Sequence, residues 1–253
     1  MALSDEYLHK LRTFYDQEHI SVLGFECKHR CECEQDAKPS ILLRGAEGYV
    51  GPRYGEATKV VFMSLDVGNE TEDENRTLRG RRRVFENLPK KLNPHLAGTL
   101  AILQALFSED LEVPQDNPWP FFVLLNAAKC SRRDSWKKVN DRLYDRCRSF
   151  AHGELSLLSP DILVTQGKKA KGGLEDWEKI SDAALDETIR LHATSSAPSR
   201  EEITAANRYI CLARIAGRRV VAMHTLTLPI MGRDGGKSSE PSCLSALGWL
   251  VNW

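Results

Sequence analysis

Short apolar runs alternate along the chain with stretches in which apolar residues recur at helical spacing. The runs are rich in valine, isoleucine, leucine and phenylalanine, which is typical of strands buried on both faces. They predict strands at residues 59–65, 119–127, 162–165, 209–215 and 219–223. The helical spacing predicts helices at residues 3–20, 96–107, 140–158 and 244–253.

Strands that alternate with helices indicate a mostly parallel sheet, because each parallel connection needs a crossover. The sequence therefore predicts an α/β fold, a three-layer α/β/α sandwich with a central, mostly parallel sheet. We expect one domain over residues 1–253, in which residues 1–58 hold an N-terminal helix and a cysteine cluster. Residues 171–207 are charged and poor in strand signals, so we interpret them as an insertion.

Composition limits the classes of partner. The chain has 35 basic and 35 acidic residues and no formal net charge, so nucleic-acid binding would have to depend on local basic patches. Such patches occur at residues 76–91, 129–138 and 168–171, although each could also be a solvated surface. The chain lacks an apolar run long enough for a membrane span and has no signal-peptide pattern. We expect a monomer in the cytoplasm with no membrane partner.

Polar side chains stand at the carboxyl ends of several predicted strands, namely Asp66, Asn126, Gln166 and His224. In open parallel sheets ligands bind at this edge, so these side chains are expected to converge there. Simpler interpretations stay open for each of them. Asn126 could cap a turn, Asp66 could only orient the loop that follows it, and His224 could be a structural histidine.

Cysteine spacing points to a metal. Seven cysteines occur, and three of them lie close together in the segment ECKHRCECEQ. Such a group in a reducing compartment is typical of metal ligation, and four thiolates suit either zinc or an iron–sulfur cluster. The alternative is that Cys130 and Cys147 are buried apolar residues, as free cysteines often are.

Residues 121–170 carry the most specific pattern. A strand ends in asparagine and is followed by lysine and cysteine (FFVLLNAAKC), then by a basic loop, a helix with Cys147 and a strand reading ILVTQG. This segment resembles the NVVKC and VIVALG motifs of the iron–sulfur uracil-DNA glycosylases. The order of the other elements also agrees over most of residues 20–235, with residues 171–207 unaligned.

The resemblance implies a DNA glycosylase, an enzyme that flips a base out of DNA and hydrolyses its N-glycosidic bond. Asn126 would read the edge of the flipped base, and His224 would stabilise the negative charge on the departing base. A [4Fe–4S] cluster would be bound by four cysteines, with zinc as the alternative metal. Its ligands would be Cys27, Cys31, Cys130 and Cys147, with Cys33 as the substitute for one of the first pair.

Three motifs depart from the family pattern. Leu65 stands in place of a glutamate, so Asp66 becomes the candidate catalytic carboxylate, and Gly68 ends the altered substrate-binding loop. His95 stands where the family has a phenylalanine that stacks on uracil. In the last motif His224 is followed by threonine and leucine instead of proline and serine. These changes suggest that the target is a modified pyrimidine as well as, or instead of, uracil.

Two alternatives stay open at this point. One is a glycosylase that removes hypermodified bases of phage DNA in antiviral defence. The other is a catalytically inert relative that only binds DNA. Loss of base release with retained DNA affinity, after substitution of Asp66 or His224, would separate an enzyme from an inert binder.

Overall fold

The computed structural model describes residues 3–37, 44–65, 72–108, 110–131, 141–172, 178–179, 210–215 and 218–225. Several predicted features lie outside these ranges. They are Asp66, Gly68, most of the insertion at residues 171–207 and the C-terminal helix at residues 244–253. Within the described ranges, no helix combines the length and the apolar character that crossing a bilayer requires.

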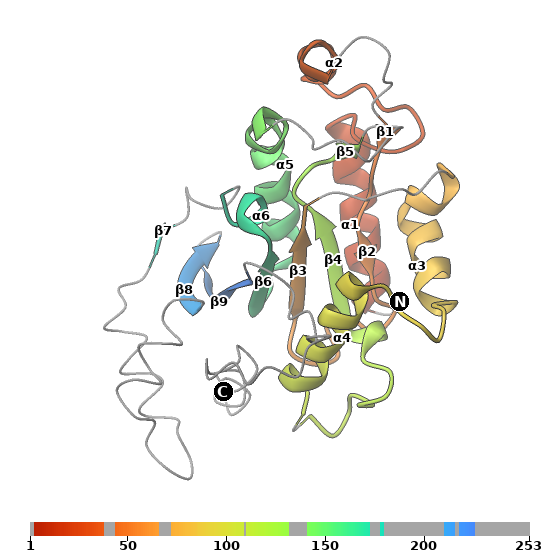
Figure 1. The fold of residues 1–253 in the computed structure, drawn as a ribbon, viewed down its shortest axis with the longest axis vertical. Coiled ribbons are helices and arrows are strands. Elements are labelled where there is room, and N and C mark those ends of the chain that lie inside the picture. The colour runs from red at the N-terminus through yellow and green to blue at the C-terminus, as the bar shows by residue number, and fades with distance from the viewer. Residues whose placement is uncertain are drawn as a thin grey trace, which may run out of the picture.

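Among the described residues, seven strands form one sheet in the order β2-β4-β3-β6-β9-β8-β7 (Figure 1). The four central strands pair in parallel: β4 (Phe122–Asn126), β3 (Val60–Ser64), β6 (Ile162–Gln166) and β9 (Arg218–Thr225). Antiparallel pairs extend the sheet at both sides, with β2 (Tyr49–Val50) on β4, and β8 (Ile210–Ile215) and β7 (Glu178–Lys179) beyond β9. The predicted α/β class and the parallel centre of the sheet are confirmed, whereas the outer strands are antiparallel.

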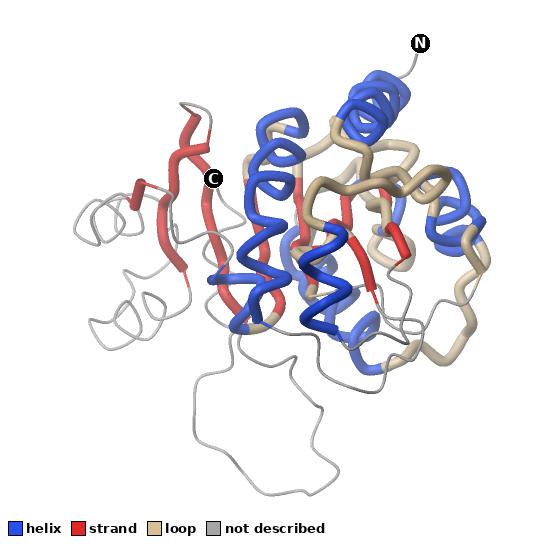
Figure 2. Tube along the Cα trace, turned by 90° about the horizontal axis from the view of Figure 1, so that it is seen from above, coloured by secondary structure: helices blue, strands red, loops and turns tan. Residues whose placement is uncertain are grey.

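Helices pack on both faces of the sheet. One face, here called the α5 face, is covered by α1 (Leu3–Gln17), α5 (Asp141–Leu158) and α6 (Lys168–Gly172). The other face, the α4 face, is covered by α4 (Pro94–Leu106) and by Phe85 of α3 (Leu78–Glu86). In Figure 1 α4 passes in front of the strands, and Figure 2 shows the same arrangement from above, with helices in blue and strands in red.

Alternation along each strand separates the two faces. In β3, Val61 and Met63 belong to the apolar cluster on the α5 face, whereas Val60 and Phe62 belong to the cluster on the α4 face. The remaining central strands alternate in the same way, because successive side chains of a strand point to opposite sides. Both clusters are buried, which explains why these strands appear in the sequence as continuous apolar runs.

Local sequence explains where α4 begins. The Asn93 side chain accepts a hydrogen bond from the Leu96 amide (2.9 Å), and Pro94 occupies the first turn. Both are preferred at helix starts, because the first amides have no partner within the helix and proline has no amide to satisfy. This start places His95 in the first turn of α4, close to the end of β3.

A smaller ribbon lies beyond the carboxyl ends of β3 and β4. It consists of β1 (Arg44–Gly45) paired with β5 (Cys130–Ser131), and α2 (Arg30–Ala37) lies near it at the top of Figure 1. Short 3-10 turns at Glu74–Arg76 and Trp119–Phe121 precede α3 and β4. The pattern of apolar residues did not predict α2 or α3, because both are rich in charged residues and bury few side chains.

A fully buried ion pair and a hydrogen bond join α5 and α1 to the segment that follows β4. Lys129 Nζ contacts Glu154 Oε2 of α5, and the two side chains are 2% and 0% exposed. Tyr15 of α1 donates a hydrogen bond to the other oxygen of Glu154 (2.6 Å) and accepts one from the Gly48 amide (3.2 Å). Burial raises the pKa of Glu154, while Lys129 and the Tyr15 hydroxyl stabilise its ionised form.

Candidate functional site

Three polar side chains meet where the central strands end on the α4 face. Ser64 of β3 lies in register with Asn126 of β4, and Gln166 ends the neighbouring strand β6. All three are buried and have the strand parity of the apolar residues that face α4. The predicted convergence of Asn126 and Gln166 at this edge is therefore present, with Ser64 between them.

Hydrogen bonds connect this edge to α4. Ser64 Oγ donates to Gln166 Oε1 (2.6 Å), and Gln166 Nε2 donates to Thr99 Oγ1 (2.9 Å). Ser64 Oγ also lies 3.1 Å from His95 Nε2. Because the one Ser64 proton goes to Gln166, the bond to His95 requires the proton to be on the histidine Nε2. The network therefore places a proton on His95 Nε2 and fixes the orientation of the Gln166 amide.

Asn126 differs from its neighbours. Its side chain is 2% exposed, and Asn126 Nδ2 is buried without a hydrogen-bond partner in the described part of the chain. Leaving such a donor without an acceptor in the interior costs about 1–3 kcal/mol. A buried amide donor of this kind at the ligand-binding edge of an α/β sheet is a natural place for an acceptor atom of a ligand.

His224 does not join this group. His224 Nδ1 lies 2.7 Å from Thr165 Oγ1, and the two residues are register partners in β9 and β6. Both have the parity of Leu163 and Val220, which belong to the cluster on the α5 face. The structure thus places His224 and Asn126 on opposite faces of the sheet, because their strand positions differ by one step of the alternation.

The loop after β3 carries the other residues expected here, and Asp66 and Gly68 lie outside the described residues. Leu65, at the position where the resembling family has glutamate, is 37% exposed. Its side chain fills the space beside Gly167, which has a φ of +99° and follows Gln166 directly. A side chain at residue 167 would be strained in this conformation and would press against Leu65.

Four cysteines share one buried region next to this edge. Cys27, Cys33, Cys130 and Cys147 are all buried and belong to the same apolar cluster on the α5 face. Burial raises the pKa of each thiol, to about 12 for Cys147, and for Cys130, Cys147 and Cys27 the neighbouring sulfur atoms add to the effect. Cys31, in contrast, is exposed on α2. The structure therefore brings together Cys27, Cys130 and Cys147 with Cys33, the substitute, and leaves Cys31 apart.

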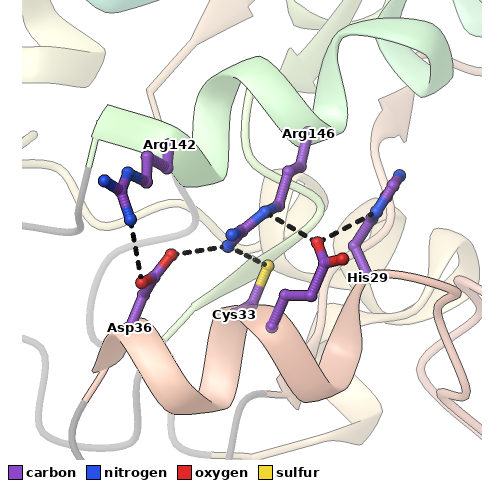
Figure 3. Close-up of polar contacts among 6 residues, drawn as sticks. His29, Cys33, Asp36, Arg142 and Arg146 are labelled. Atoms are coloured by element: carbon purple, nitrogen blue, oxygen red, sulfur yellow. Dashed lines mark hydrogen bonds and ion pairs between the residues drawn. The ribbon is translucent and has the colours of Figure 1, made fainter.

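Arg146 of α5 lies beside Cys33 and the acidic side chains of α2 (Figure 3). Arg146 Nη1 donates to Cys33 Sγ (3.6 Å) and to Asp36 Oδ2 (2.8 Å), and Arg146 Nε lies 3.0 Å from Glu32 Oε2. Arg142 adds a contact to Asp36 (3.4 Å). These bonds hold α2, which carries Cys33, against α5, which carries Cys147.

A backbone amide and a buried positive charge act on the thiols of the core. The Lys129 amide donates to Cys147 Sγ (3.3 Å), and the buried Arg76 lowers the pKa of Cys130, although burial outweighs this effect. Donors of this kind stabilise thiolates, which are the form that binds metals. The donor set suits a metal held by four cysteines. Within the described ranges, no three cysteine, histidine, aspartate or glutamate side chains lie close enough together to hold one metal ion.

The basic patches are partly structural. Arg76 is fully buried and donates to the carbonyl groups of Gly45 (2.8 Å) and Arg44 (2.9 Å), and Lys129 pairs with Glu154 in the core. Neither side chain is on the surface that a phosphate could reach. Lys90, Lys91 and Lys168 are exposed. The remainder of the patch at residues 129–138 lies largely outside the described residues.

Sequence reasoning did not assign roles to Ser64, Thr99 or Arg146. A serine or a threonine within an apolar run is weak evidence of a site, and Arg146 is one of many arginines in the chain. A scan against models of protein families and a search of curated proteins find no match for this chain.

Proposed function

We propose that the protein is a DNA glycosylase with the three-layer α/β/α fold of the uracil-DNA glycosylases. The observation that carries the proposal is Asn126, whose buried Nδ2 donor has no partner in the described residues. It ends a central parallel strand at the edge where such sheets bind ligands. An amide here can offer a donor and an acceptor to the polar edge of a base that has been rotated out of DNA.

The reaction is hydrolysis of the bond between the sugar and the base. The C1′–N bond breaks and its electron pair stays on the base, which becomes an anion, while the sugar gains oxocarbenium character. Water adds its oxygen to C1′, and one of its protons ends on the departing base, which leaves an abasic site. Asn126 would orient the base, and Asp66 is the candidate for positioning the water.

A [4Fe–4S] cluster is the proposed cofactor, with Cys27, Cys33, Cys130 and Cys147 as its ligands. Cys33 replaces Cys31 in this set because Cys33 is buried beside the other three thiols, whereas Cys31 is exposed. All four cysteines would bind it as thiolates, which is the form of cysteine that holds an iron–sulfur cluster. The cluster would brace α2, β5 and α5 beside the edge that carries Asn126.

The target base is proposed to be uracil or a modified pyrimidine. Replacement of the family's glutamate by Leu65 and of its stacking phenylalanine by His95 supports a base other than plain uracil. A role in defence against phages with hypermodified DNA depends on the same argument. An inert DNA-binding relative is the alternative from another class.

One panel experiment tests the proposal. Protein purified without oxygen is incubated with DNA that contains uracil, mismatches or modified phage bases, and abasic sites are measured by alkaline cleavage. We expect base release from at least one substrate, and a loss of about 100-fold or more in Asn126→Ala with DNA affinity retained. Binding without release from any DNA would refute the enzyme and support the inert relative. Equal activity of Asn126→Ala would refute the role of Asn126.

A further inference from the structure

His95 and His224 are both candidates for contacting the base, and they lie on opposite faces of the sheet. We propose that His95, and not His224, is the imidazole that donates a hydrogen bond to the departing base. The inference rests on the proposed glycosylase function, and it assigns to His95 a chemical role different from the stacking role expected from the sequence.

The two faces of the sheet decide which histidine can act with Asn126. Asn126, Ser64 and Gln166 point to the α4 face, and His95 belongs to α4 itself. His224 points to the α5 face, where its Nδ1 atom lies 2.7 Å from Thr165 Oγ1. A base whose edge contacts Asn126 therefore lies on the side of His95, with the strands between it and the imidazole of His224.

The hydrogen-bond network shows which atom of His95 donates. Ser64 Oγ gives its proton to Gln166 Oε1 (2.6 Å), so His95 Nε2 must supply the proton of the 3.1 Å bond to Ser64. Thr99 Oγ1 accepts from Gln166 Nε2 and donates to the His95 carbonyl group (3.0 Å), which ties the network to the first turn of α4. Every polar atom in this ring has a consistent donor or acceptor role.

In this arrangement the proton on His95 Nε2 can also be donated to a second acceptor, a carbonyl oxygen of the base. Ser64 lies in register with Asn126, so the proton on His95 Nε2 is directed towards the same strand end as the Asn126 amide. When a base carbonyl oxygen comes beside Asn126, His95 can turn this donor to it, and Ser64 still keeps its bond to Gln166. The bond strengthens as negative charge develops on the base, which is the condition for catalysis by a donor.

His95 is only partly exposed, and its contact with Ser64 joins α4 to the sheet. A stacking role would need the ring face alone, whereas the proposed role needs the N–H group. Two substitutions distinguish these roles. His95→Phe keeps an aromatic face and removes the donor, whereas His95→Gln removes the ring and keeps an amide donor of similar reach.

The experiment compares single-turnover base release by His95→Gln, His95→Phe and His224→Gln, with DNA affinity and circular dichroism measured for each variant. We expect His95→Phe to lose about 100-fold or more in rate, His95→Gln to lose about tenfold, and His224→Gln to stay within about threefold of the unsubstituted protein. Faster release by His95→Phe than by His95→Gln would overturn the donor role. A large loss in His224→Gln with a normal His95→Phe would overturn the assignment itself.

A second measurement separates failure of this inference from failure of the proposed function. Nitrogen-15 spectra of labelled histidine are recorded with single-stranded DNA that carries a base analogue resistant to cleavage. If no DNA in the panel loses a base, the glycosylase proposal fails, but a DNA-induced shift of the His95 Nε2 signal would still support the contact. A shift of His224 alone, or of neither histidine, would overturn it.

Discussion

The buried pair of Lys129 and Glu154 gives the sharpest prediction about stability. Replacing Lys129 by methionine fills nearly the same space but leaves the Glu154 carboxylate 0% exposed, with the Tyr15 hydroxyl as its remaining hydrogen-bond donor among the described residues. Removing one partner of a buried ion pair costs about 3–5 kcal/mol, because the other charge stays in a medium that solvates it poorly. We expect Lys129→Met to lower the free energy of unfolding by about this amount.

The double variant Lys129→Met/Glu154→Gln tests the cause. It removes both charges, and the glutamine oxygen can still accept the hydrogen bond from Tyr15. We expect it to recover all but about 1–2 kcal/mol, because replacing both members of a buried pair is often close to neutral. Glu154→Gln alone completes the cycle and leaves the Lys129 ammonium without its carboxylate.

Urea unfolding followed by circular dichroism measures these differences by linear extrapolation. The iron content is measured for all variants and matched, because any metal that binds the folded protein would add to its stability. A loss below about 1 kcal/mol in Lys129→Met, or a double variant no better than the two single losses added, would refute the account. If Lys129→Met does not fold, folding of the double variant still supports it.

Three other predictions concern the cysteines and the buried phenols. We expect Cys33→Ser to lose at least half of the iron that the unsubstituted protein binds after anaerobic purification, and Cys31→Ser to keep it, as measured by iron analysis. A larger loss of iron in Cys31→Ser than in Cys33→Ser would contradict the ligand set proposed above. Arg146→Met should release iron to a chelator several-fold faster, because it removes the bonds from α5 to Cys33 and to the acidic side chains of α2. Arg142→Met, which removes a contact to Asp36 and leaves the bond to Cys33 in place, is the control, and equal release rates would contradict this. Burial raises the pKa of Tyr15, Tyr49 and Tyr54 above the ordinary value near 10, so their contribution to stability is complete below about pH 10 and is lost as the pH rises further. Ultraviolet titration should show these three ionising only together with unfolding, and a smooth titration of all six in folded protein would contradict the burial of Tyr15, Tyr49 and Tyr54.

Hydrophobic patterning alone was sufficient to place the central strands. The runs at residues 59–65, 119–127 and 162–165 coincide with β3, β4 and β6, because strands buried on both faces have to be apolar throughout. The pattern missed α2 and α3, in which at least half of the residues are charged and whose stability depends on contacts with the rest of the molecule. Ion pairs between α2 and α5 join residues far apart in the sequence, so no local pattern reveals them.

Site residues were predictable as residue types but not as a constellation. The sequence by itself determined that polar groups end the strands and that cysteines come in an N-terminal group and a later pair. Only the tertiary structure decided that His224 lies on the face opposite Asn126, that His95 shares the Asn126 face, and that Cys33 is buried while Cys31 is exposed. The physical reason is that one residue along a strand reverses the direction of a side chain, and a few residues along a helix turn it from the core to solvent. Composition and order along the chain do not carry that information.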